Sequence, residues 1–347
     1  MTGSHIEQRV SETTDATADL HPRITGIRVT DVSGITGTLV WVALAVLTVW
    51  SGFAWLSLPE LFVSLAVLVL VPLGLGIVGA GFQYEQTPLA YRLAVSGQLP
   101  AALAAVGALA LPVGTMSAVA LALPWLAVTG CVALVGVHRL FSRGVTAGPL
   151  PELAADAALL YVPVGAVALV LHTADVTFHF KPIIILLTVV HYHYAGFVLP
   201  LVAGMAGRIV ADEQGHFGET LLGRAMAATT LVVVVNLALI AVGITFSPLV
   251  EVVAVAFFTV AVAIFALCIL FGVGPRVGRG RRVLLSIAAL SIVWTMALAL
   301  AYGYSAYPGT PELLTLNEMI LRHGSVNAFG FALPTLLAFR WRTPRRR

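Results

Sequence analysis

Long stretches without a charged residue dominate this sequence. None of Asp, Glu, Lys, Arg or His occurs between Asp31 and Glu60, between Glu60 and Glu85, or between Arg92 and His138. Each stretch is long enough for one or two membrane spans of roughly 20 residues. These runs do not alternate with the period of a strand, and backbone groups in lipid need internal partners, so helices are expected. With 59% hydrophobic and 10% charged residues, the chain is predicted to be an all-α, polytopic integral membrane bundle.

The apolar runs predict ten transmembrane helices. Pro112-Val113-Gly114 separates the third from the fourth, and Ser247-Pro248 separates the seventh from the eighth. The helices are expected at residues 36–56, 61–83, 94–112, 115–137, 153–172, 182–207, 220–246, 249–272, 283–305 and 324–340. The predicted domains are a disordered tail (1–34), a ten-helix transmembrane domain (35–340) and a basic C-terminal tail (341–347).

The basic residues predict the orientation of this bundle. If both termini are cytoplasmic, all but two of the 19 Lys and Arg residues lie on the cytoplasmic side. The two exceptions are Lys181 and Arg322. Positively charged loops stay in the cytoplasm, and an odd number of spans would remove the bias. We therefore expect a multi-pass protein of a prokaryotic cell membrane, with the lipid bilayer as its first partner.

A histidine pair, His191 and His193, lies inside the sixth predicted span. Ionisable side chains at that depth are costly and mark functional sites by default. The segment that follows, Gly-Phe-Val-Leu-Pro at 196–200, is echoed by Gly-Phe-Ala-Leu-Pro at 330–334. His323 and Asn327 lie just before the echo, and Asn327 occupies the position that matches His193. The echo is either accidental or marks two related helices that line one cavity.

Helix geometry limits what the histidine pair can do. His191 and His193 are about 200° apart on a regular helix, so both cannot face one ligand unless the backbone unwinds. Pro200 frees the carbonyl of Gly196, and Gly196 permits close approach of a second helix. Gly330 and Pro334 are expected to act in the same way in the echo. Both segments are therefore predicted to be kinked, closely packed helices.

The histidines favour a ligand site that opens to the outside. Imidazole is the commonest metal ligand, and histidines from two helices can hold haem. The leading hypothesis is that His191, His193 and His323 bind a transition metal or haem. Four further residues are expected to support these ligands or to line their cavity: Asn327, Glu60, His172 and Tyr194. No known ligand spacing supports this, because His-x-x-x-His, His-Glu-x-x-His and Cys-x-x-Cys-His are all absent.

Two other interpretations stay open. The histidines and tyrosines can form a purely structural hydrogen-bonded layer between helices, or the same cavity can serve a proton-coupled carrier of a small solute. No catalytic motif is recognisable, and Cys131 and Cys268 indicate neither a disulfide nor a zinc site. Nothing points to a nucleic-acid partner, and the oligomeric state is left open.

The segments at 190–197 (Val-His-Tyr-His-Tyr-Ala-Gly-Phe) and 322–331 (Arg-His-Gly-Ser-Val-Asn-Ala-Phe-Gly-Phe) resemble the YndJ-like membrane proteins. Residues 59–62 (Pro-Glu-Leu-Phe) and 71–75 (Val-Pro-Leu-Gly-Leu) look similar too. The resemblance spans roughly residues 36–340. It implies a polytopic membrane region and places His191, His193, His323 and Asn327 in one site. The family is essentially uncharacterised, so the resemblance implies no substrate or activity.

Overall fold

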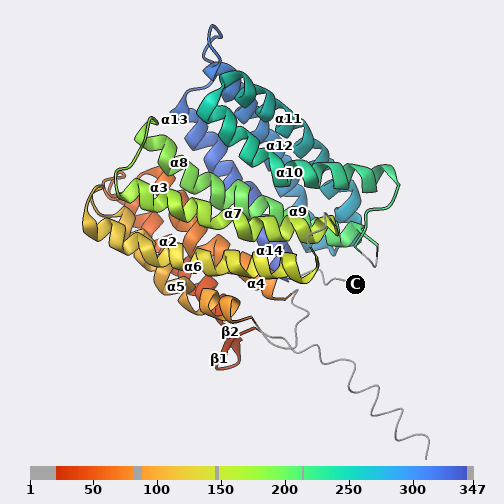
Figure 1. Ribbon diagram of the computed structural model, residues 1–347, viewed down its shortest axis with the longest axis horizontal. Coiled ribbons are helices and arrows are strands. Elements are labelled where there is room, and N and C mark those ends of the chain that lie inside the picture. The colour runs from red at the N-terminus through yellow and green to blue at the C-terminus, as the bar shows by residue number, and fades with distance from the viewer. Residues whose placement is uncertain (1–20, 81–87, 145–147, 213–214, 342–347) are drawn as a thin grey trace, which may run out of the picture.

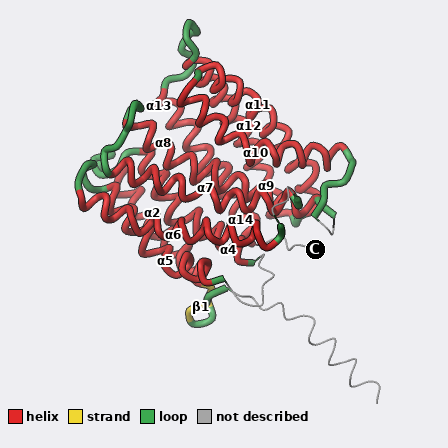
Figure 2. Tube along the Cα trace, in the orientation of Figure 1, coloured by secondary structure: helices red, strands yellow, loops and turns green. Residues whose placement is uncertain are grey.

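The computed structural model describes residues 21–80, 88–144, 148–212 and 215–341. Over these residues it is a bundle of long helices with one short hairpin (Figures 1 and 2). Nine of the described helices are long and apolar enough to cross a membrane. The predicted class, an all-α multi-pass membrane protein, is confirmed.

The helices follow the predicted spans closely. Six of the spans are single α-helices: α2 (Val29–Trp50), α5 (Leu89–Leu109), α6 (Met116–Ser142), α7 (Leu150–Thr173), α10 (Leu221–Phe246) and α12 (Arg279–Ala306). The predicted break at 112–114 separates α5 from α6, where Gly114 has a φ of 80°. Between α10 and α11 only Ser247 remains outside a helix, as the Ser-Pro dipeptide predicts.

The other four spans contain π-helical turns. One consists of α3 (Leu58–Leu65), η1 (Ala66–Leu70) and α4 (Val71–Gly79), and another of α8 (Pro182–His193), η2 (Tyr194–Val198) and α9 (Leu199–Val210). A third consists of α11 (Pro248–Leu267), η3 (Cys268–Val273) and the short 3₁₀ turn η4 (Gly274–Arg276). The last consists of α13 (Leu316–Glu318), η5 (Met319–Gly324), η6 (Val326–Ala332) and α14 (Leu333–Trp341).

Four of these π turns end two residues before a proline. The prolines are Pro72, Pro200, Pro275 and Pro334, after η1, η2, η3 and η6 respectively. Proline has no N–H to donate and its ring collides with the carbonyl four residues earlier, so the helix widens there. The kinks expected from Pro200 and Pro334 therefore take the form of π turns.

The second span lies at the centre of the bundle. The α3–η1–α4 segment is almost entirely buried and contacts α2, α5, α8, η5 and α14. Around it, helices that are consecutive in the chain pack against each other, as α5 does with α6 and α6 with α7. On the far side, α10, α11 and α12 form a second consecutive group (Figure 1).

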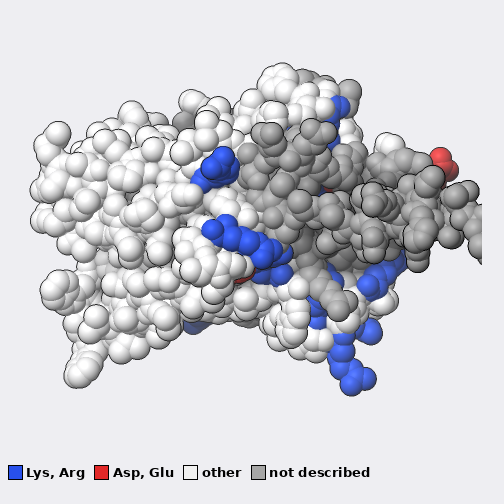
Figure 3. Space-filling model, turned by 90° about the horizontal axis from the view of Figure 1, so that it is seen from below, with Lys and Arg blue, Asp and Glu red and all other residues white. Residues whose placement is uncertain are grey.

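Much of the surface is apolar, as contact with a lipid bilayer requires. Large apolar side chains are exposed along several helices, among them Leu39, Val46, Leu231, Phe257 and Leu290. Figure 3 shows a broad uncharged area over one part of the molecule and Lys and Arg side chains gathered toward the other. An uncharged band flanked by basic residues is expected of a membrane-embedded bundle.

The predicted boundary of the N-terminal tail is wrong for residues 21–34. Strands β1 (Arg23–Ile24) and β2 (Ile27–Arg28) form a two-stranded antiparallel hairpin, and α2 begins directly after it. Asp31 and Thr30 of α2 hold Arg340 of α14 by an ion pair and a hydrogen bond. These contacts order polar residues that the composition alone assigned to the tail. Residues 1–20 and 342–347 lie outside the described residues.

Candidate functional site

Two of the predicted histidines are neighbours in the fold. His191 is in the last turn of α8, and His323 is in the π turn η5 of the last span. Their ring centroids are 6.5 Å apart, with 30° between the ring planes. The residues are separated by more than a hundred positions in the chain, so only the tertiary fold brings them together.

Both rings are oriented by backbone carbonyls. His191 Nδ1 lies 2.7 Å from the carbonyl oxygen of Leu187, and His323 Nδ1 lies 2.9 Å from that of Thr295. A carbonyl only accepts, so Nδ1 of each ring carries the proton and Nε2 carries a lone pair. Neither Nε2 has a hydrogen-bond partner among the described residues. The side chain of His191 is exposed on the surface of the bundle, and that of His323 is half-buried.

Asn327 is linked to His323 through Thr295. The hydroxyl of Thr295 donates to Asn327 Oδ1 at 3.1 Å, while the Thr295 carbonyl accepts from His323. A single residue of α12 therefore orients two polar side chains of the last span. Sequence reasoning missed Thr295, because an isolated threonine in an apolar helix usually bonds to its own backbone.

His193, in contrast, does not join His191 and His323. It is fully buried. Its Nε2 accepts from Trp125 Nε1 at 3.1 Å, and its Nδ1 lies 2.7 Å from the Val189 carbonyl oxygen. With both ring nitrogens engaged, no lone pair is left for a ligand. His193 therefore fits the structural interpretation, and its inclusion among the ligands is corrected. The reason is the roughly 200° between alternate residues of a helix.

The other predicted site residues, Tyr194, Glu60 and His172, also interact with groups other than the histidine pair. The Tyr194 hydroxyl donates to the Phe62 carbonyl at 2.9 Å. Glu60 caps its own helix, where Oε2 accepts from the Ser57 backbone N–H at 2.6 Å. His172, at the end of α7, interacts electrostatically with Glu60 rather than with the histidine pair. No hydrogen bond or ion pair joins Glu60 to His191 or His323 in the part of the chain that is described.

The echoed segments lie in contact, because η2 packs against η6. The glycine in each allows close approach of a neighbouring helix. A Cβ on Gly196 would lie 3.2 Å from side-chain atoms of Tyr161 and Leu237, and one on Gly330 would lie 2.3 Å from Ser291 Oγ. At both glycines, therefore, a neighbouring helix lies too close to leave free space for a side chain.

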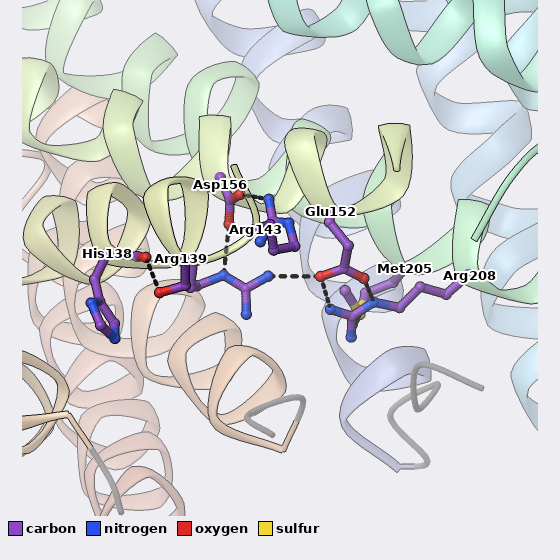
Figure 4. Close-up of polar contacts among 8 residues, drawn as sticks. His138, Arg139, Arg143, Glu152, Asp156, Met205 and Arg208 are labelled. Carbon is purple, nitrogen blue, oxygen red and sulfur yellow. Dashed lines mark hydrogen bonds and ion pairs between the residues drawn. The ribbon is translucent and has the colours of Figure 1, made fainter. Parts of the chain in front are cut away.

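A second polar cluster, which sequence reasoning missed, lies where α6, α7 and α9 meet (Figure 4). Glu152 accepts from Arg139 Nη2 at 2.9 Å and from Arg208 Nε at 2.7 Å. Asp156 accepts from Arg139 Nε at 2.6 Å and also pairs with Arg143. The side chains of Glu152 and Asp156 are 6% and 0% exposed, so the ions are shielded from solvent.

The spacing of this ionic cluster contained a usable signal. Arg139 and Arg143 are four residues apart at the end of one helix, and Glu152 and Asp156 are four apart at the start of the next. Residues four apart share a helix face, and a short connection places the two faces opposite each other. For the orientation of the bundle, these arginines contribute only as basic residues on one side of the membrane.

The fold and its polar clusters define a multi-pass helical membrane protein with a polar interior built on several helices. Comparison with known proteins then identifies the family. The family model described as YndJ-like protein matches residues 61–331, and the chain belongs to this family. It is 30% identical over 291 residues to the uncharacterized membrane protein YndJ of Bacillus subtilis (strain 168). That match covers 82% of this chain and 49% of the relative, so the chain spans about half the relative's length. No solved structure matches the chain.

Proposed function

We propose that His191 and His323 bind a transition metal ion within the bundle. The observation that carries this proposal is the shared orientation of the two rings by backbone carbonyls, which leaves both Nε2 lone pairs without a partner. Metal-ligating histidines almost always donate their other ring N–H to a carbonyl, a carboxylate or water. Asn327 and Thr295 would support the site by holding His323 in place.

The test is metal content together with a visible spectrum of the detergent-purified protein. We expect a stoichiometric transition metal that is lost in both His191→Ala and His323→Ala, because each variant removes one of the two ligands. A Soret band lost in the same variants would identify the ion as haem iron.

His179→Ala is the matched control, because His179 is exposed in the connection between α7 and α8. This variant should keep the full metal content. Equal metal in all four proteins, or none in any of them, would contradict the proposal.

We also propose that both termini are cytoplasmic, so that the histidine pair lies nearer the outer face. The support is the distribution of Lys and Arg residues. Single cysteines in a background lacking Cys131 and Cys268 test it. A membrane-impermeant thiol reagent should label Thr177→Cys in intact cells and leave Gly278→Cys unlabelled. The reverse pattern would invert the orientation.

A further inference from the structure

The number of ligands at the histidine pair points to a particular class of ion. Two imidazole rings are neighbours there, and no group of three His, Cys, Asp or Glu residues suited to a metal occurs among the described residues. Zinc in proteins is almost always four-coordinate, and other divalent ions of the first row also take four or more ligands. Two protein ligands alone satisfy a monovalent d¹⁰ ion, which accepts a linear arrangement.

The separation of the rings agrees with a linear arrangement. Metal–nitrogen bonds of about 2.0–2.1 Å would place the two ring centroids about 6.4 Å apart if the ion were collinear with both rings, and about 5.2 Å apart at a tetrahedral angle. The observed distance between the centroids is 6.5 Å. The centroid separation therefore matches the spacing that two rings would have if both Nε2 atoms were directed at one ion midway between them.

The charges around the pair favour a single positive charge. Both imidazoles are neutral ligands, and Glu60 is engaged at its own helix N-terminus. Arg322, next to His323, pairs with Glu318 at 3.3 Å. The Glu318 carboxylate also accepts hydrogen bonds from the backbone N–H and the hydroxyl of Thr315, at 3.1 and 2.9 Å, so it is engaged at this end of the helix. The desolvation cost of an ion rises with the square of its charge, so an uncompensated divalent ion is penalised about fourfold more.

We infer that the His191–His323 pair is a two-coordinate site for a monovalent d¹⁰ cation, Cu⁺ or Ag⁺, in preference to divalent ions. This inference rests on the proposed function, because it specifies which metal the same two rings hold. It requires no redox step, since the ion would bind as Cu⁺ or Ag⁺ and leave unchanged.

The experiment is a competition titration of the full-length chain in detergent under anaerobic, reducing conditions. A chromophoric Cu⁺ chelator reports the copper that the protein withdraws, and calorimetry measures Zn²⁺, Ni²⁺ and Co²⁺. Thiols are strong Cu⁺ ligands, so the parent carries Cys131→Ser and Cys268→Ala. We expect one Cu⁺ per chain. Affinity should fall more than about 100-fold in His191→Ala and in His323→Ala, since even supporting residues of metal sites contribute 10–100-fold. His179→Ala should leave it unchanged.

The possible results distinguish the choice of a monovalent ion from the proposal that His191 and His323 bind a metal at all. Tighter binding of a divalent ion than of Cu⁺, lost in the same two variants, would overturn the choice of ion and retain the metal site. Binding of no ion, or binding that survives both substitutions, would overturn both. X-ray absorption of the Cu⁺ form gives an independent readout: two nitrogen neighbours support a linear site, and four neighbours exclude it.

Discussion

Replacing Glu152 by Gln is expected to lower the free energy of unfolding by about 3–5 kcal/mol, the usual cost of removing one partner of a buried ion pair. The amide has almost the same size as the carboxylate, so the change removes charge and little packing. Arg139 and Arg208 would each lose a charged acceptor while remaining 5% exposed. Denaturant titration in detergent, followed by tryptophan fluorescence, measures the difference.

The matched control is Glu318→Gln, which removes the same charge from the pair that Glu318 forms with Arg322. Those two side chains are 41% and 56% exposed, and water replaces such a contact readily. Gln can still accept the hydrogen bonds of Thr315 in the capping box, so the free energy of unfolding should change far less than in Glu152→Gln. If both variants unfold alike, the ions around Glu152 are not buried as described and the cluster does not stabilise the bundle.

Gly37→Ala is expected to destabilise the protein by about 1–3 kcal/mol, the usual penalty for inserting a group into a filled interior. A Cβ at Gly37 would lie 1.9 Å from the Leu68 carbonyl oxygen and 2.8 Å from its carbonyl carbon. Both atoms belong to the backbone of η1, which no side-chain rotation can move. Helix α2 packs on the π turn only because position 37 has no side chain.

Gly130→Ala is the control for this second prediction, because a Cβ there would meet nothing within 4 Å. It should be neutral or stabilising by up to about 1 kcal/mol, since alanine is the better helix former. Thermal unfolding in detergent compares the two variants directly. A loss of stability at Gly130 equal to that at Gly37 would show that the cost comes from the helix itself and not from the contact with Leu68.

The candidate site was predictable in part. Helix periodicity already separated His191 from His193, and the structure places the two rings on different neighbours. The π turns of the echoed segments, residues 196–200 and 330–334, are in contact. It did not reveal that Trp125 engages His193 or that Thr295 holds His323. Both contacts come from helices distant in the chain, and no local pattern marks either residue.

The sequence by itself determined the class of protein, the ten helical spans and the kinks at Pro200 and Pro334. A bilayer demands long, uniformly apolar segments, so the spans are a local signal. Pro100, Pro124 and Pro163 lie inside regular α-helices, so a proline alone does not determine where a π turn forms. Tertiary structure alone decided which histidine meets which partner and that Arg208 of α9 joins the carboxylate of Glu152. Those outcomes depend on how each helix is rotated about its axis. Helices that are apolar on every side carry no stripe from which that rotation could be read.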